Sequence, residues 1–167
     1  MKFGVISARR AGTAIVLAAL LVALTLLLQF TGAYAVFTVG TVRKLPVYSV
    51  EREDNALAIT FDCAWGTEHT DAILKALEEA NVRATFFTVQ FWAEEHPDYL
   101  KKIDEAGHEI GTHSATHPKM SQLSEEAIKS ELTTSSRAIT EVTGKAVTLF
   151  RPPFGDYDDL LVQTVAD

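Results

Sequence analysis

The chain has 167 residues, of which 47% are hydrophobic and 22% charged, enough for one domain of ordinary size with a buried core. All 22 acidic residues and 12 of the 15 basic residues follow residue 30, so this part carries a net charge of about −10. So acidic a chain lacks the basic surface that binds nucleic acid, and we expect no such partner. Cys63 is the only cysteine, which excludes a disulfide within the chain.

The N-terminus has the pattern of a membrane-targeting segment. Residues 1–10 carry three basic residues and no acid, and residues 11–30 are uncharged and mostly apolar. A helix of about 20 apolar residues spans the hydrocarbon layer, and basic residues before it favour the cytoplasmic side. We therefore predict a transmembrane anchor with the domain outside the cytoplasm. The alternative is a secretory signal that is cleaved near Ala35, with the domain secreted.

The remaining chain alternates between two periodicities. Residues 31–55 are expected to form a linker or lead-in strand, and residues 56–167 the folded domain. Short apolar, β-rich runs predict strands over residues 56–61, 84–89, 108–112 and 147–150. Strands separated by helices at this spacing predict right-handed βα units around a parallel sheet. The fold class is therefore α/β.

Helical patterns fill the segments between the strands, with apolar residues at three- and four-residue spacing. Several helix ends are marked by typical residues: Thr70 and Ser124 as N-caps, Pro97 near a helix start, and Gly107 and Gly144 just past helix ends. A last helix is predicted within residues 157–167.

Polar, reactive residues follow three of the four predicted strands. Asp62 and Cys63 end the first strand, His113 follows the third, and Arg151 follows the fourth. The carboxyl ends of parallel strands meet at one edge of a sheet, where such folds place their chemistry. We therefore expect these side chains to share one pocket.

His113 and His117 are four residues apart in the segment HSATH. On a helical turn, two imidazoles at this spacing can bind one cation, as in other zinc motifs. The spacing alone is equally compatible with two polar residues in a turn before Pro118. The three other histidines have no partner at such a spacing and receive no role.

Asp62 and its neighbour Cys63 each allow two interpretations. A carboxylate directly after an apolar strand either caps a helix or, beside a metal, acts as a general base toward bound water. A lone cysteine is either a small buried hydrophobe or a thiolate ligand, because zinc accepts sulfur and nitrogen together.

The segment FRPPFG places Arg151 before two prolines, which prevent a helix or strand from continuing. Such a rigid loop fixes the orientation of its backbone N–H groups. The N–H group of Phe154 or of Gly155 could therefore donate to an oxyanion. Arg151 could clamp a carboxylate such as Asp62. The alternative is a turn with a solvated arginine.

Together, the segments TFDCAWG, HSATH and RPPFG resemble, in order and separation, the motifs of the polysaccharide deacetylase family, the NodB homology domain of carbohydrate esterase family 4. The apolar N-terminus and the Trp-Gly pair most resemble its sporulation-type branch. The resemblance covers about residues 55–167. It implies a distorted (β/α) barrel, here a partial one preceded by a transmembrane helix.

The resemblance also implies a divalent metal, most often Zn²⁺, and a role for each matching residue. Asp62 matches the catalytic base, His113 and His117 two metal ligands, Arg151 the residue that orients the base, and Phe154 the backbone N–H that supports the oxyanion. The implied reaction removes N-acetyl groups from an N-acetylated glycan, peptidoglycan or a chitooligosaccharide, and gives acetate and a free amine.

Two departures from the family pattern keep a second function open. Cys63 stands where the family has a second Asp as third metal ligand, and a thiolate does not favour a hard cation. Two further family motifs, one with the general-acid histidine, would lie beyond Asp167, so we expect an incomplete, C-terminally truncated domain. The candidates are therefore a metal-dependent deacetylase, inactive as this chain, and a membrane-anchored, non-catalytic glycan-binding pseudoenzyme. A doubly wound α/β binding domain is disfavoured because no Gly-rich phosphate loop occurs.

Overall fold

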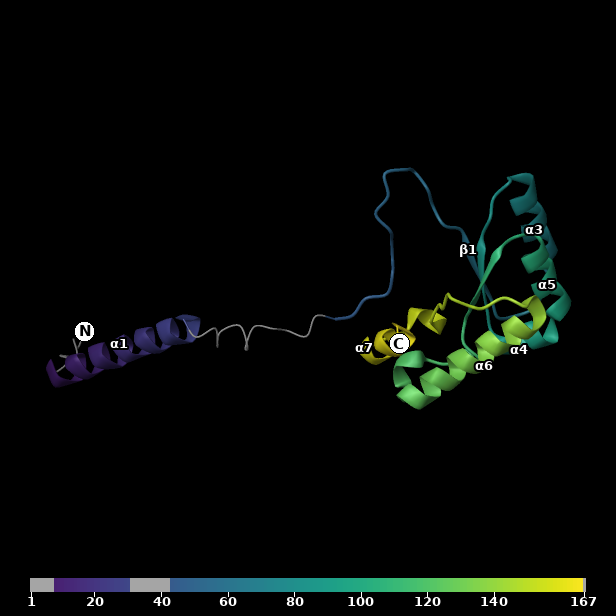
Figure 1. The fold of residues 1–167 in the computed structure, drawn as a ribbon. Helices are drawn as coiled ribbons and strands as arrows, with labels where there is room; N and C mark the ends of the chain where they lie inside the picture. Colours follow the sequence, from purple (N-terminus) through teal and green to yellow (C-terminus); the bar gives the residue numbers. More distant parts are fainter. Residues whose placement is uncertain (1–7, 31–42, 167) are drawn as a thin grey trace, which may run out of the picture. The chain divides into compact units, whose positions relative to one another are not determined.

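The computed structural model describes residues 8–30 and 43–166, and the chain divides into two units between Arg43 and Lys44. In the first unit, helix α1 spans Ala8–Phe30 (Figure 1). Its stretch Ala11–Phe30 has a mean hydropathy of 2.6 and is long and apolar enough to cross a membrane, a test that an N-terminal signal sequence also passes. The possible cleavage site near Ala35 lies outside the described residues.

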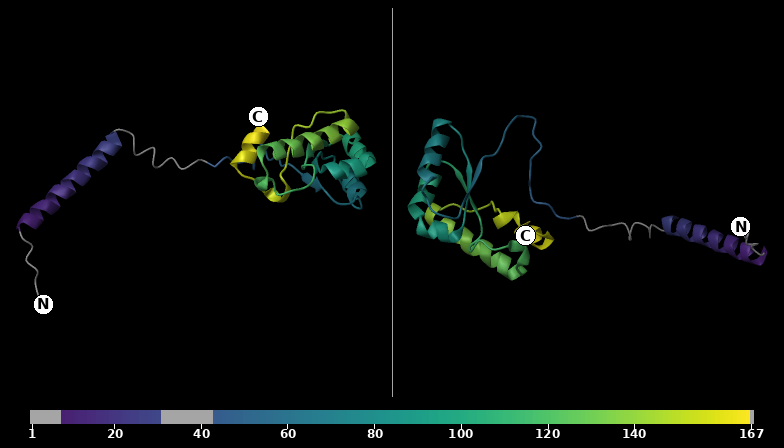
Figure 2. Two further views of the ribbon diagram at one scale, coloured as in Figure 1. Left: turned by 90° about the horizontal axis from the view of Figure 1, so that it is seen from below. Right: turned by 180° about the vertical axis from the view of Figure 1, so that it is seen from behind.

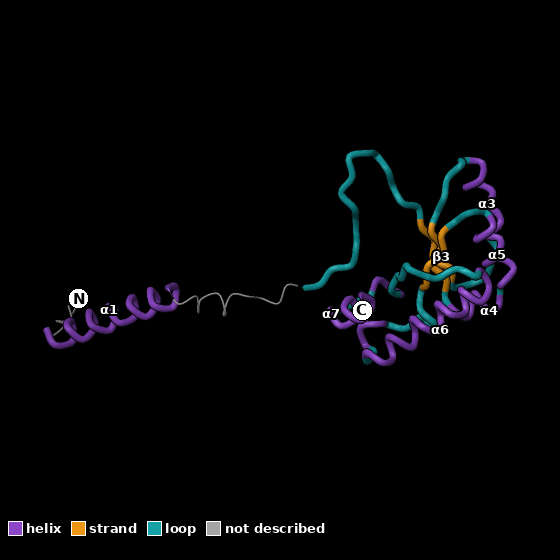
Figure 3. The backbone as a smooth tube through the Cα atoms, in the orientation of Figure 1, coloured by secondary structure: helices purple, strands orange, loops and turns teal. Residues whose placement is uncertain are grey.

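Three parallel strands form the sheet of the second unit, in the order β1-β2-β3. The strands are drawn in orange in Figure 3. They are β1 Thr60–Cys63, β2 Thr85–Thr88 and β3 Glu109–Thr112. The first begins four residues later than predicted, because its partner β2 starts only at Thr85, opposite Thr60. Residues 43–55 contain no strand, so the described part of the predicted lead-in strand is absent.

The predicted fourth strand over residues 147–150 is reduced to one isolated bridge between Phe150 and Thr112. Thr112 N donates to Leu149 O at 2.8 Å, and Arg151 N donates to Thr112 O at 3.0 Å. The two prolines that follow have no N–H group, so the ladder cannot continue beyond Arg151. The bridge nevertheless holds Arg151 beside the carboxyl end of β3.

The helices of this unit fall between and after the strands. They are α3 Thr70–Glu79, α4 Gln90–Glu95, α5 Pro97–Glu105, α6 Glu125–Thr143 and α7 Asp159–Ala166, with 3-10 turns η1 Met120–Gln122 and η2 Pro153–Gly155. Helices α3 and α5 lie together along one side of the sheet, and α7 lies beside α6 (Figures 1 and 2). The short α4 was not predicted, because six residues are too few to display a helical period.

The predicted helix ends are largely confirmed. Pro97 is the first residue of α5, the Ser124 hydroxyl accepts from Ala127 N at 3.3 Å, and Gly144 ends α6 with a left-handed φ of 69°. Thr70 as an N-cap is wrong by one residue. His69 occupies that position without a side-chain hydrogen bond, and Thr70 is the buried first residue of α3.

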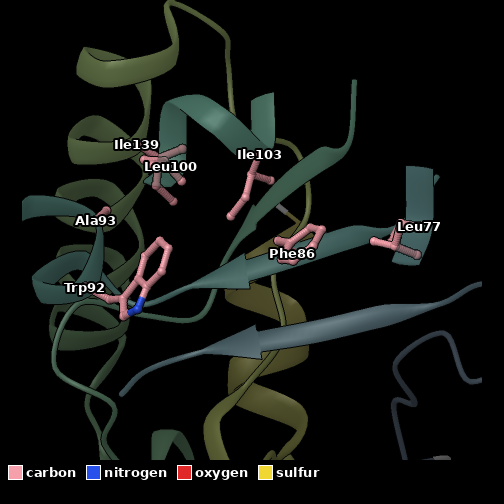
Figure 4. Close-up of a cluster of buried hydrophobic side chains, with 8 residues drawn as sticks. Leu77, Phe86, Trp92, Ala93, Leu100, Ile103 and Ile139 are labelled. Carbon is pink, nitrogen blue, oxygen red and sulfur yellow. The ribbon is translucent and has the colours of Figure 1, made fainter. Parts of the chain in front are cut away.

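Alternation along the strands gives the sheet two chemically different faces. The first face carries mostly polar side chains: Thr60, Asp62, Thr85, Phe87, Glu109 and the hydrogen of Gly111. The second carries Phe61, Cys63, Phe86, Thr88, Ile110 and Thr112. Helices α3, α5 and α6 supply Leu77, Leu100 and Ile139 to the buried cluster around Phe86 on this second face (Figure 4). The core therefore lies on one side of the sheet, and the polar side is left for chemistry.

At the amino end of β3, His108 is 6% exposed and accepts a hydrogen bond at Nδ1 from Ala84 N at 3.3 Å. Burial lowers the pKa of His108, and the nearby Arg83 lowers it further. The unfolded chain takes up the proton near the ordinary pKa of about 6.5, whereas the folded chain does so only at lower pH. Between these values the unfolded state binds more protons, so the free energy of unfolding falls as pH falls.

We therefore expect the midpoint of thermal unfolding to drop between pH 7.5 and pH 5.5, and to drop less in His108→Gln because one proton-binding group is removed. His69→Gln, at an exposed position, serves as the matched control and should keep the full pH dependence. Equal pH dependence in wild type and His108→Gln would contradict the role of His108.

Candidate active site

Asp62 and Arg151 form an ion pair on the polar face of the sheet. Arg151 Nη1 donates to Asp62 Oδ1 at 2.8 Å, and Nη2 donates to Thr60 Oγ1 at 2.9 Å. The guanidinium lies 4.3 Å from the centroid of the Phe87 ring. Thr60, Asp62 and Phe87 share this face, which lets one arginine side chain contact all three. With side chains 35% and 43% exposed, such a pair contributes at most about 1 kcal/mol to stability, and its main effect is to orient the carboxylate.

His113 lies buried beside this pair, with only 3% of its surface exposed. Its Nδ1 is 2.7 Å from the Arg151 carbonyl oxygen, which can only accept, so Nδ1 carries the hydrogen and Nε2 keeps its lone pair. Nε2 is 4.0 Å from Asp62 Oδ2. Burial lowers the pKa of His113, an effect that the hydrogen bond to the carbonyl and the charge of Asp62 oppose. The neutral imidazole therefore presents Nε2 toward the carboxylate.

The ring of His117 lies 5.0 Å from that of His113, centroid to centroid. Residues 113–119 form a tight loop rather than the helical turn that the spacing suggested. Ser114 and His117 both adopt left-handed backbone angles, with φ of 76° and 58°, and the Ser114 hydroxyl accepts from His117 N at 3.0 Å. Left-handed φ is costly for residues other than glycine, so strain in this loop brings the imidazoles together.

Glu131 of α6 holds this loop through hydrogen bonds, a role that the sequence pattern did not predict. Its carboxylate accepts from Ala115 N, Thr116 N and Thr116 Oγ1, each at 2.8 Å. Three bonds to a charged acceptor satisfy the donors of the segment between the two histidines. The sequence contains only one signal of this role: an acidic residue in a helix, at a position that the neighbouring apolar residues predict to be partly buried.

The arginine loop is held in a similar way by Asp156. Its carboxylate accepts from Ser121 N at 2.8 Å and Ser121 Oγ at 2.9 Å, which lowers the pKa of Asp156. Within the loop, Gly155 N donates to Pro152 O at 3.2 Å, so the Gly155 N–H is already engaged. Phe154 has a φ of 60° and a side chain 69% exposed, and its ring lies 4.8 Å from that of His117.

Cys63 is not brought to the imidazole pair. It is still paired in the ladder, opposite Thr88, so the alternation of β1 holds through this residue and turns it to the face opposite Asp62. There it packs against the buried hydrophobic cluster. Burial raises the pKa of the Cys63 thiol to about 12, with a further contribution from Asp62. The side chain is therefore a neutral thiol in an apolar environment.

These placements bear on whether the residues fit a metal ion. His113 and His117 supply two imidazoles, and a backbone carbonyl behind the first fixes its tautomer in the way that metal-ligating histidines usually require. Among residues 8–30 and 43–166, however, no group of three or more His, Cys, Asp or Glu side chains converges as a metal site. Zinc sites use three or four protein ligands, so the arrangement does not fit a complete one.

A hollow of about 210 Å³ opens beside Asp62. Its lining combines the Trp65 ring with polar side chains of the loop that leads into α3, among them Thr67 and His69. A larger hollow of about 360 Å³ contains Arg83 and His108, which precede β2 and β3 and thus lie at the opposite end of the strands. The first hollow is singled out by Asp62 in its lining rather than by size. It is also lined by Phe61, Cys63 and Phe86 of the core face, and His113, His117 and Arg151 are not part of its lining.

Comparison with known proteins places these motifs in a family. The family model described as polysaccharide deacetylase matches residues 49–167. The uncharacterized protein YlxY of Bacillus subtilis is 32% identical over 122 residues, which are 73% of this chain and 38% of that protein. A peptidoglycan-N-acetylglucosamine deacetylase of Bacillus cereus is 34% identical over 100 residues, which are 60% of this chain and 36% of the relative.

Solved structures give the same result. A CE4 family pseudoenzyme from Bacillus anthracis matches with a TM-score of 0.64 and 37% identity, over 66% of this chain and 39% of that one. A mutant of it, described as having restored enzymatic activity, matches with a TM-score of 0.64 and 39% identity, over 66% and 40% of the two chains. The chain thus spans less than half the length of the relatives and structures named here.

The incomplete ligand set predicts weak zinc binding that depends on the histidines and not on the thiol. After dialysis of the full chain against Zn²⁺, metal analysis should find bound zinc lowered by His113→Ala and by His117→Ala, and unchanged by Cys63→Ser. One equivalent of tightly bound zinc that is lost in Cys63→Ser would show instead that the thiolate is a ligand.

The three hydrogen bonds of Glu131 predict a structural cost when one acceptor oxygen is removed. Glu131→Gln should lower the free energy of unfolding by about 2 kcal/mol and speed amide exchange at Ala115 and Thr116. Glu141→Gln, at an exposed position of the same helix, is the matched control. Equal effects of the two substitutions, measured by chemical unfolding and hydrogen exchange, would show that the hydrogen bonds of Glu131 do not stabilise the loop between the histidines.

Proposed function

Because this chain belongs to the polysaccharide deacetylase family, we propose that its site at Asp62 removes N-acetyl groups from an N-acetylated cell-wall glycan such as peptidoglycan. The observation that carries the proposal is the convergence of Asp62, His113 and Arg151, from three distant segments, on one edge of the sheet. The guanidinium donates to the acid at 2.8 Å, and the neutral imidazole lies 4.0 Å from the other carboxylate oxygen, so the site combines groups that can serve hydrolysis of an amide.

The geometry suggests a division of labour within the site. Arg151 occupies Asp62 Oδ1, so Oδ2 is the oxygen that remains to take a proton from an attacking water. Attack of that water on the acetamide carbon gives a tetrahedral oxyanion, toward which we propose that Phe154 N–H donates. Breakage of the C–N bond, with the proton passed to nitrogen, then yields acetate and the free amine.

Deacetylases of this family are generally metal-dependent, and a metal would supply polarisation of the acetamide carbonyl. We propose that His113 and His117 are the residues of this chain that hold such an ion, and that the ion is Zn²⁺ because both donors are imidazoles. Cys63, the third ligand predicted from the sequence, would have to leave the core and lose its proton first. This requirement is the main physical argument against full activity.

We propose an extracytoplasmic location for the domain. Helix α1 would anchor it in the membrane, with the N-terminal basic residues on the cytoplasmic side. Cleavage of the helix as a signal near Ala35 is the alternative and also delivers the domain to the glycan. Both routes agree with relatives whose names place their substrate in the cell wall.

A second candidate is a glycan-binding pseudoenzyme without catalysis. The specific observation in its favour is the neutral, core-facing Cys63, which leaves the imidazole pair without a third protein donor. A solved relative with 37% identity is itself described as a CE4 family pseudoenzyme. Both candidates use the same surface and differ in whether acetate is released.

Acetate release from an N-acetylglucosamine tetramer and from purified peptidoglycan tests the two candidates with the full chain. If Asp62 is the base, Asp62→Asn should lower the rate by about a hundredfold or more, because general-base catalysis is worth that much. Asp54→Asn is the matched control, since Asp54 pairs only with Arg52 among the contacts described for it and lies outside the site.

The outcomes separate cleanly. Release that depends on Asp62 supports the deacetylase. No release, combined with binding of the tetramer by the wild-type chain, supports the pseudoenzyme and contradicts catalysis. Release that is equal in wild type and Asp62→Asn, or no release together with no binding, contradicts the assigned site.

A further inference from the structure

We propose that Trp65 and Phe154 form an aromatic platform on which a pyranose ring of the N-acetylated glycan stacks next to Asp62. This inference rests on the proposed function, since it specifies how that site holds its substrate. It concerns side chains to which the hydrolytic reaction itself assigns no chemical part.

The first argument is exposure. Trp65 is 78% exposed and Phe154 69% exposed, although both belong to a domain with a well-formed core. The second tryptophan behaves in the ordinary way: Trp92 is 1% exposed and donates from Nε1 to Gly66 O at 2.7 Å. A large ring left in water forgoes the free energy of burial, and exposed apolar groups beside a polar site indicate a binding surface.

The second argument is the continuity of the rings with the reactive groups. The Trp65 ring lies 6.3 Å from that of His117, which lies 4.8 Å from the ring of Phe154 and 5.0 Å from that of His113. His113 Nε2 is in turn 4.0 Å from Asp62 Oδ2. The two exposed rings therefore both contact His117, and through His113 this imidazole connects them to the carboxylate of Asp62.

The third argument is that both rings are held in place. The backbone next to Trp65 is held by the hydrogen bond from Trp92 to the carbonyl oxygen of Gly66, and the φ of 60° at Gly66 is one that glycine adopts without strain. The Trp65 ring itself packs 5.4 Å from that of Phe91. Phe154 keeps a left-handed φ of 60° at a cost that the rest of its loop must offset. Rings fixed before binding lose little entropy when a ligand arrives.

The fourth argument is the chemistry of the hollow beside Trp65. Its lining places Trp65 and the apolar side chains of Phe61, Ile73 and Phe86 next to polar groups. These are hydroxyl, carboxylate and imidazole groups from Thr67, Glu68, His69 and Thr70. A pyranose presents C–H groups on its faces and hydroxyl groups at its edge, which matches an aromatic wall bordered by hydrogen-bonding groups. At about 210 Å³ the hollow is smaller than most ligand pockets, which fits a platform for one ring of an extended chain.

Tryptophan fluorescence tests the platform directly, because the chain has two tryptophans and Trp92 is buried. Acrylamide should quench Trp65 in the free protein. A tetramer of N-acetylglucosamine should protect it, whereas maltotetraose should not. By calorimetry, Trp65→Ala should weaken tetramer binding about tenfold and Trp65→Phe about threefold, in keeping with the worth of an aromatic contact.

Leu57→Ala is the matched control, because Leu57 is 79% exposed but precedes β1 and thus lies at the opposite end of the strand. It should bind the tetramer as the wild type does. Circular dichroism of each variant verifies folding. Tetramer affinity that is unchanged in Trp65→Ala, or no tetramer binding by the wild-type chain, would overturn the platform.

Acetate release measured on the same proteins separates this inference from the proposed reaction. Asp62→Asn should bind the tetramer normally while failing to release acetate. Binding that depends on Trp65 in a chain that releases no acetate upholds the platform and refutes catalysis. Acetate release with a KM unchanged by Trp65→Ala upholds catalysis and refutes the platform.

Discussion

The pleat of β1 is the constraint on which the site depends. Successive side chains of a strand point to opposite faces, so Asp62 faces Arg151 while Cys63 faces the core. The pairing of Cys63 with Thr88 extends this alternation to the last residue of the strand. A side chain at position 63 can join the imidazoles only if the end of β1 changes its backbone conformation. Burial of the neutral Cys63 thiol against the core favours the present conformation instead.

The loops of the site obtain their shape from carboxylates that take no part in its chemistry. Glu131 holds the loop between the histidines, and Asp156 holds the loop after Arg151. Both act from outside the sheet, on strained backbone with left-handed φ at Ser114 and Phe154. Strain persists only where surrounding contacts determine the conformation, so these two acids account for why the rings and imidazoles keep their positions.

The sequence predicted the parallel sheet and the edge at which Asp62, His113 and Arg151 meet, because apolar runs and helical periods are properties of local composition. Prediction from the sequence failed for features that depend on contacts with residues elsewhere in the chain. The predicted fourth strand is only a single bridge at Phe150, because the two prolines after Arg151 have no N–H group to donate to a ladder. The hydrogen bonds of Glu131 require α6 to pack against the loop between the two histidines, which precedes α6 in the chain. No spacing pattern in the sequence predicts that contact.

The side chains proposed for recognition differ from those proposed for catalysis. The exposed rings of Trp65 and Phe154 are positioned by the backbone of two loops and by ring contacts with His117, whereas Cys63 packs against the buried hydrophobic cluster. Under the proposed functions, a chain without a metal donor at position 63 would therefore keep both exposed rings. Under the two proposed functions, Cys63 is therefore the position at which deacetylation and glycan binding without catalysis would diverge.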